Sequence, residues 1–149
     1  MLTSKEKIII GSDHGGVELK AVIVEYLKSR GDIEVNDIGT YSTESVDYPI
    51  YGIKVAKAVA KGEASRGIVI CGTGIGITIA ANKVRGIRAA NCVTPYMAEM
   101  TRKHNNANVL GLGGRIVDNK TATEITKIWL ETAYEGGRHQ KRLDLIEEA

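Results

Sequence analysis

The chain has 149 residues, a usual length for one domain, and its 43% hydrophobic and 26% charged residues are ordinary for a globular protein. A formal net charge of +2 is too small to indicate a nucleic-acid or membrane partner. No apolar run approaches the length of a membrane span, the N-terminus lacks a secretory pattern, and two cysteines do not make a disulfide framework. We therefore expect one domain over residues 1–149, located in the cytoplasm.

Short β-rich runs alternate with helical patterns along the chain, which is typical of βαβ units around a parallel sheet. The predicted strands are Ile8–Gly11, Glu34–Ile38, Gly67–Cys71, Ile87–Val93 and Asn108–Leu112. The pattern predicts a Rossmann-like α/β/α sandwich of three layers with a five-stranded parallel sheet. We expect the first strand to lie in the centre of that sheet.

Helices are predicted between and after these strands. The first carries an apolar stripe from Leu19 to Leu27 and ends near Gly31, and the second runs from Tyr48-Pro49 to about Lys61. The third follows Gly76, and the fourth runs from Thr94-Pro95 to near His104-Asn105. The fifth starts with a capping box, Thr121 to Glu124, and a short charged helix after Gly137 forms a C-terminal extension.

Ligands of open α/β sheets bind at the carboxyl ends of the strands. The segments that follow the predicted strands are also the polar and Gly-rich parts of this chain: Ser12–Gly16, the loop before Pro49, Gly72–Gly76 and Gly113–Arg115. Strand-end position and composition together predict a binding site at this edge.

The loop Cys71–Gly76 is the strongest local signal, because three glycines that enter a helix let backbone N–H groups converge on an anion. Its G-x-G-x-G spacing after the third strand, with no acidic residue between Ile77 and Ala98, fits a dinucleotide-binding loop poorly. Cys71 stands beside a helix N-terminus, where a thiol is accessible and reactive. Cys92 fits an inert core residue better.

Other polar residues have ordinary alternatives. Asp13-His14 could cap a helix, His104 could complement a helix C-terminus, and Arg138 and Arg142, one turn apart, could clamp a phosphate or form a solvated basic face. The three histidines and two cysteines are never at metal-ligand spacing, so we expect no metal site.

Five segments converge on one family. In chain order they are Ser12–Gly16, Asp47–Pro49, Cys71–Gly76 with Ala80–Lys83, Arg102–Asn105, and Glu135–Arg142. Together, from Ile8 to about Arg142, they resemble the type B ribose-5-phosphate isomerases, which are related to galactose- and allose-phosphate isomerases. The resemblance implies an aldose–ketose isomerase of the non-oxidative pentose phosphate pathway that needs neither cofactor nor metal.

The resemblance also implies roles for individual residues. Cys71 would be the base that moves a proton between C1 and C2, Thr73 would help to move the hydroxyl proton, and His104 would open the furanose ring. The remaining substrate contacts would be Gly72, Gly74 and Gly76 to the enediolate, Asp13, Tyr48 and Asn105 to the sugar, and His14, Arg115, Arg138 and Arg142 to the phosphate.

In this family the active site lies between two subunits, which implies a homodimer or a dimer of dimers with His104 supplied by the partner chain. A branch without the cysteine is thought to use a glutamate a few residues later, but Gly76-Ile77-Thr78 stand there in this chain. Cys71 is therefore the base that the resemblance implies.

Several alternatives remain open at this point. Allose 6-phosphate or galactose 6-phosphate could be the substrate, although a complete set of expected residues in one chain favours ribose 5-phosphate. A non-catalytic sugar-phosphate- or nucleotide-binding module would bind without turnover and would tolerate Cys71→Ser. A thiol redox protein would need a resolving cysteine, and Cys92 is expected on a different strand.

Overall fold

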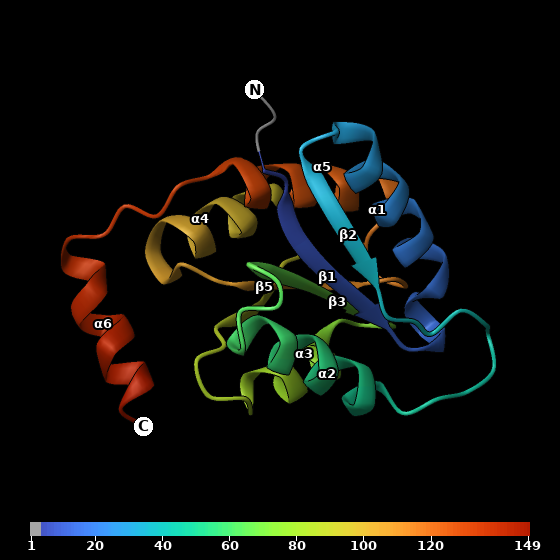
Figure 1. Ribbon diagram of the computed structural model, residues 1–149, viewed down its shortest axis with the longest axis horizontal. Helices are drawn as coiled ribbons and strands as arrows, with labels where there is room; N and C mark the ends of the chain where they lie inside the picture. The colour runs from blue at the N-terminus through green and yellow to red at the C-terminus, as the bar shows by residue number, and fades with distance from the viewer. Residues whose placement is uncertain (1–3) are drawn as a thin grey trace.

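The computed structural model describes residues 4–149, which form an open parallel sheet with helices on both faces (Figure 1). The strands are β1 (Glu6–Ser12), β2 (Ile33–Asp37), β3 (Arg66–Cys71), β4 (Ala89–Asn91) and β5 (Val109–Gly113). The helices are α1 (Val17–Arg30), α2 (Tyr48–Ala60), α3 (Ile75–Asn82), α4 (Pro95–Asn105), α5 (Asn119–Glu131) and α6 (Arg138–Glu147), with a short 3₁₀ turn, η1, at His14–Gly16. The predicted fold class is confirmed.

Strand order in the sheet is β2-β1-β3-β5-β4, with every neighbouring pair parallel. The centre is therefore β3, and the expectation that the first strand is central is wrong by one position: β1 lies between β2 and β3. This order puts the carboxyl ends of β1, β3 and β5 side by side, because these three strands are consecutive neighbours.

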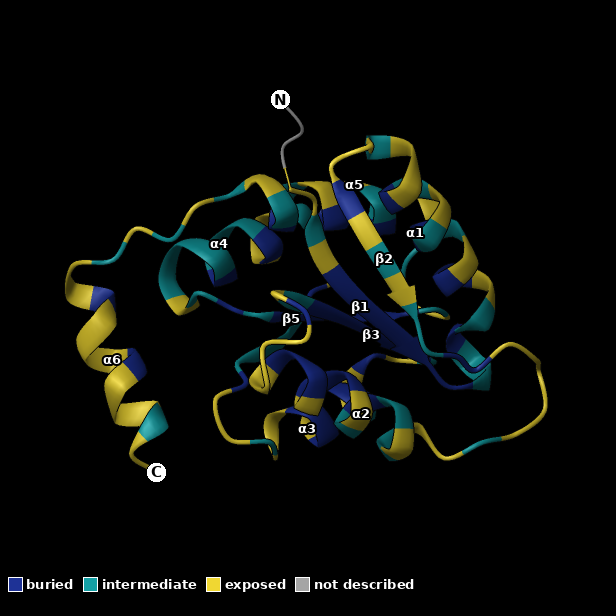
Figure 2. Cartoon of the chain, viewed as in Figure 1, coloured by how far each residue is buried: buried dark blue, intermediate teal, exposed yellow. Residues whose placement is uncertain are grey.

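The core follows the alternation of side chains along buried strands. Ile8 and Ile10 of β1 face a cluster that contains Ile23 of α1 and Trp129 of α5, while Ile9 faces a second cluster with Val55 of α2. Helices α1, α4 and α5 thus cover one face of the sheet, and α2 and α3 cover the other. Figure 2 shows the central strands buried between these two layers.

Strand β4 is shorter than predicted. The Arg88 backbone N–H donates to the side chain of Asn108 (2.8 Å), which removes it from the sheet ladder. On the opposite side of Ala89, the Asn82 side chain donates to the Ala89 carbonyl (2.9 Å) and accepts from its N–H (2.7 Å). The side-chain amide of Asn82 thus forms hydrogen bonds with the N–H and carbonyl groups of Ala89 that point away from β5.

The start of α5 also differs from the prediction. The helix begins at Asn119, and Oδ1 of the N-cap Asp118 accepts from the Thr121 N–H at 2.7 Å. The expected capping box from Thr121 to Glu124 is wrong, because a carboxylate cap three residues earlier places both residues inside the helix. The C-terminal helix is confirmed as α6, which packs against α4. None of the helices in residues 4–149 has the length and apolar character that crossing a membrane requires.

An ion pair ties β1, β3 and α5 together. Arg66 donates from Nε and Nη2 to the Glu6 carboxylate at 2.7 and 2.8 Å, and its guanidinium lies 4.8 Å from the centre of the Trp129 ring. Burial alone would raise the pKa of Glu6, but hydrogen bonds from Arg66 and Ser65 outweigh that effect and hold the pKa below its ordinary value.

We expect Glu6→Gln to destabilise the protein by about 1 kcal/mol at pH 7, because a partly exposed but bidentate pair is lost. Because the pKa of Glu6 is lowered in the folded state, the ion pair contributes fully to the free energy of unfolding at pH values above the ordinary carboxyl pKa. This contribution disappears as the pH falls through the pKa of folded Glu6. Urea unfolding at pH 7 and pH 3 measures this. The loss of unfolding free energy caused by Glu6→Gln should be smaller at pH 3 than at pH 7. Glu25→Gln, on the exposed face of α1, is the control and should show no such pH dependence. An equal loss at both pH values for Glu6→Gln would contradict the stabilising role of the ion pair.

Candidate active site

Three loops at the carboxyl edge pack backbone against backbone. The Asp13 N–H donates to the Ile70 carbonyl (3.2 Å), and the N–H groups of Gly114 and Arg115 donate to the carbonyls of Cys71 (2.8 Å) and Gly72 (2.9 Å). A Cβ on Gly15 would lie 3.1 Å from the Gly72 nitrogen, and one on Gly114 only 2.6 Å from the Gly15 oxygen. The loops after β1, β3 and β5 therefore touch only because glycine stands at the contacts.

Cys71 ends β3 with its thiol directed at the start of α3. The residue is 5% exposed, and its Sγ accepts a hydrogen bond from the Gly74 N–H at 3.2 Å. Gly74 is the N-cap of α3 with φ +82°, a left-handed conformation that favours glycine. The sulfur is thus held in one position at the positive end of a helix dipole.

Thr73 belongs to the Cys71–Gly76 loop, and Tyr48 packs on that loop. Thr73 Oγ1 accepts from the Ile75 N–H (3.2 Å), and the Asn91 side chain donates to the Thr73 carbonyl (3.4 Å). A Cβ on Gly76 would lie 2.7 Å from ring carbons of Tyr48, so the phenol packs directly on the loop. The structure brings Asp13, Tyr48, Cys71 and Thr73 together at the end of the sheet.

His14 and Arg115 line a neighbouring hollow of about 260 Å³, which Gly15, Glu18, Leu19, Thr43 and Gly114 complete. The Nδ1 atom of His14 accepts from the Val46 N–H at 3.1 Å, so the neutral ring carries its proton on Nε2. That proton and the Arg115 guanidinium are donors suited to an anion. The hollow and the Cys71 loop together form the cleft that we call the thiol cleft.

Four of the predicted site residues lie elsewhere. His104 and Asn105 end α4, which begins after the carboxyl end of β4 and runs for 11 residues, about 16 Å, toward the opposite edge. Arg138 and Arg142 are on α6, which packs beside α4 at the end of the molecule farthest from α1 (Figure 1). A single chain therefore does not bring these residues to its own thiol cleft.

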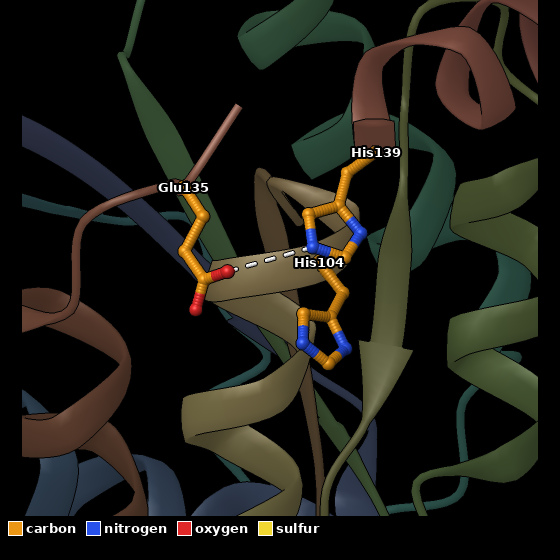
Figure 3. Close-up of side chains that lie close together, drawn as sticks. All are labelled: His104, Glu135 and His139. Atoms are coloured by element: carbon orange, nitrogen blue, oxygen red, sulfur yellow. Dashed lines mark ion pairs between the residues drawn. The ribbon is translucent and has the colours of Figure 1, made fainter. Parts of the chain in front are cut away.

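Instead, His104 meets two residues near α6 (Figure 3). Its ring stacks on that of His139 with centroids 4.4 Å apart and an interplanar angle of 19°, and Glu135 Oε2 lies 3.5 Å from His139 Nε2. We call these three residues the histidine cluster. Sequence reasoning missed it because His104 and His139 meet only through the packing of α6 on α4; the i,i+4 spacing of Glu135 and His139 was the available signal.

Sequence reasoning also missed three polar residues around the thiol cleft: Glu18, Thr43 and Asn91. Each depends on a tertiary contact that no local pattern reveals. Cys92 agrees with the expectation of a core residue, since it is 1% exposed and burial raises its pKa to about 12. Both cysteines are free thiols.

An α/β fold with a fixed thiol beside a hollow whose donors suit an anion has the groups that a sugar-phosphate isomerase needs. Residues 8–146 match the family model described as Ribose/Galactose Isomerase, so the chain belongs to this enzyme family. It is 53% identical to ribose-5-phosphate isomerase B of Escherichia coli over 95% of this chain and 94% of that protein.

Solved structures agree with this assignment. The ribose-5-phosphate isomerase B of Clostridium thermocellum matches with a TM-score of 0.94 and 58% identity, covering 95% of each chain. That of Mycoplasma genitalium, solved with bound ribulose-5-phosphate, matches with a TM-score of 0.93 and 42% identity over 98% of this chain and 97% of that one.

We expect Gly114→Ala to lower isomerase activity by about 10²-fold, because the added methyl forces the loops after β1 and β5 apart and displaces the Cys71 loop. Gly86→Ala is the matched control: its φ of +88° is strained for alanine, but no atom lies within 4 Å of the new Cβ. It should lose about 1 kcal/mol of stability and keep its activity. Steady-state kinetics and thermal unfolding separate the two effects, and full activity of Gly114→Ala would contradict the packing argument.

Proposed function

We propose that the protein interconverts D-ribose 5-phosphate and D-ribulose 5-phosphate through an enediolate, within the non-oxidative pentose phosphate pathway. The observation that carries the proposal is the Cys71 thiol, fixed by the Gly74 N–H in a loop between the sugar-facing residues Asp13 and Tyr48. The names of the similar enzymes and the bound ketose of the Mycoplasma genitalium structure support this choice of substrate.

The proposed chemistry moves one proton between two carbons. As a thiolate, Cys71 removes the C2 proton of the open-chain aldose, which leaves an enediolate with its charge on O1. After the O2 hydroxyl proton has passed to O1, the Cys71 thiol returns its proton to C1 and O2 becomes the ketose carbonyl oxygen. Thr73 carries the hydroxyl proton between O1 and O2. Backbone N–H groups of Gly72 and Gly76 face the enediolate oxygens, where oriented donors stabilise developing charge, while the Gly74 N–H holds the Cys71 sulfur against the substrate. No cofactor or metal takes part in these steps.

The hollow beside the thiol is the proposed phosphate site. His14 Nε2–H and Arg115 donate to the phosphate oxygens, and this contact lies away from the reacting carbons. Binding energy from such a remote group orients the sugar without taking part in bond making. Glu18 is the one carboxylate lining this hollow, and its repulsion disfavours a phosphate placed at that end.

The site is completed, in our proposal, by a second copy of the chain in a homodimer or a dimer of dimers. The partner would supply His104 to open the furanose ring, Asn105 to hold the sugar, and Arg138 and Arg142 to bind the phosphate. Support comes from the distance of α4 and α6 from the chain's own cleft and from exposed apolar side chains available for an interface: Ile75, Ile79, Val93, Tyr96 and Met97. A cytoplasmic location fits as well, because a catalytic thiol must stay reduced.

We expect purified protein to convert ribose 5-phosphate in the presence of EDTA, and Cys71→Ala to lose about 10²- to 10⁴-fold in kcat, because the base is gone. Cys92→Ala is the matched control, since that thiol is buried away from the cleft, and it should keep its activity. Allose 6-phosphate serves as the comparison substrate. A fully active Cys71→Ala variant refutes the base assignment, and a clear preference for allose 6-phosphate refutes the choice of substrate.

The shared active site predicts complementation between two inactive variants. A heterodimer of Cys71→Ala and His104→Asn chains contains one site with both residues intact, so random pairing should restore about a quarter of wild-type activity. Co-expression with two affinity tags isolates the hybrid, which should have about half of the wild-type activity because one of its two sites is intact. As the control, Cys71→Ala chains are paired with chains that carry both Cys71→Ala and His104→Asn, and this pairing should restore no isomerase activity. Inactive hybrids of the two single variants would mean that each site belongs to one chain.

A further inference from the structure

The histidine cluster joins three metal-binding side chains from two parts of the fold. His104 comes from the last turn of α4, Glu135 from the segment before α6, and His139 from the first turn of α6. One potential ligand atom of each residue lies within 4.8 Å of the other two. Figure 3 shows the Glu135 carboxylate directed at the His139 ring, with the two imidazoles stacked beside it.

The distance between Glu135 Oε2 and His139 Nε2 is too long for a hydrogen bond but matches the spacing of two ligands of one ion. Their N···O distance of 3.5 Å exceeds the ordinary range of a hydrogen bond. A tetrahedral ion with bonds of 2.0–2.2 Å keeps its ligand atoms about 3.4 Å apart. The nitrogen lone pairs of two stacked imidazoles do not point at a common ion, so binding requires the half-buried His104 ring to rotate out of its stack on His139 and to close a gap of about 1.4 Å.

An independent observation concerns the His139 side chain. The residue is 4% exposed, and its Nε2 atom is buried without a hydrogen-bond partner. A buried polar atom left unpaired costs about 1–3 kcal/mol, and native proteins normally satisfy such atoms. The unpaired nitrogen faces the Glu135 carboxylate and thus the space between the three residues.

We propose that His104, Glu135 and His139 form a site for a divalent transition-metal ion, with Zn²⁺ the best fit. Imidazole and carboxylate ligands in a three-residue set suit zinc and leave a fourth position for water. The consequence rests on the proposed function: an ion bound to His104 occupies the nitrogen needed to open the sugar ring. Zn²⁺ is then an inhibitor of the isomerase and not its cofactor.

The first test is direct binding to tag-free wild-type protein. Calorimetry should show one Zn²⁺ per chain, and Co²⁺ should give the visible absorption of a tetrahedral site without a thiolate-to-cobalt band. Glu135→Gln should weaken binding at least about tenfold, and His139→Gln should weaken it further. Glu148→Gln, which alters an exposed carboxylate at the end of α6, is the matched control and should bind as wild type.

Three results overturn the site: no binding by wild-type protein at about 1 mM Zn²⁺, equal binding by wild type and Glu135→Gln, or a thiolate band that assigns the ion to Cys71. Because Glu135 is exposed, Glu135→Gln keeps the test valid even if His139→Gln fails to fold.

The second test is inhibition. Isomerase activity on ribose 5-phosphate should fall over the same range of Zn²⁺ concentration as binding and recover with EDTA, while Glu135→Gln should keep its basal activity and resist zinc at least about tenfold better. Binding at the cluster without inhibition would overturn the inhibitory role and the ring-opening role of His104 but leave the metal site standing. Absence of isomerase activity in the metal-free enzyme would refute the proposed function and not the binding.

Discussion

Backbone-to-backbone contact between the loops after β1, β3 and β5 is the constraint on which the thiol cleft depends. A methyl group on Gly114 would clash with the Gly15 carbonyl, and one on Gly15 would crowd the Gly72 nitrogen. Hydrogen bonds from Gly114 and Arg115 to the Cys71–Gly72 carbonyls complete the contact. The loops can approach so closely because the three strands are neighbours in a parallel sheet. The position of the thiol is thus set by main-chain geometry, with the Gly74 N–H as its last restraint.

The same topology explains why one chain carries only part of the proposed site. A helix that covers a parallel sheet runs antiparallel to the strands, so α4 carries whatever its last turn holds away from the carboxyl edge. His104, in the last turn of α4, therefore stacks on His139 of the same chain and does not lie beside Cys71 of that chain. Any chemistry that joins His104 to Cys71 has to cross between two chains. In the proposed function, a site completed by a second chain would link catalysis to association.

The sequence predicts the fold well and the site in part. Buried strands rich in Ile and Val, glycines after them and a proline at N2 of α2 are local signals, and the structure bears them out. The exact start of α5 and the length of β4 depended on the side chains of Asp118 and Asn108, which compete with equally plausible patterns nearby. The meeting of His104 with Glu135 and His139 depended on helix packing across 31 and 35 positions, which one sequence cannot reveal. Five motifs in register indicate the family, and the family model that matches residues 8–146 shows it.

The short edge strand β4 has a consequence for how copies of this chain associate. A free strand edge is a template for another strand, and such pairing leads to open-ended polymers. Here the Asn82 amide donates to the carbonyl of Ala89 and accepts from its N–H, so these two backbone groups of the edge strand are already hydrogen-bonded. The sheet is thereby protected from extension at β4, one of its two edges. At that edge a single asparagine side chain protects the chain against pairing with a strand of another molecule.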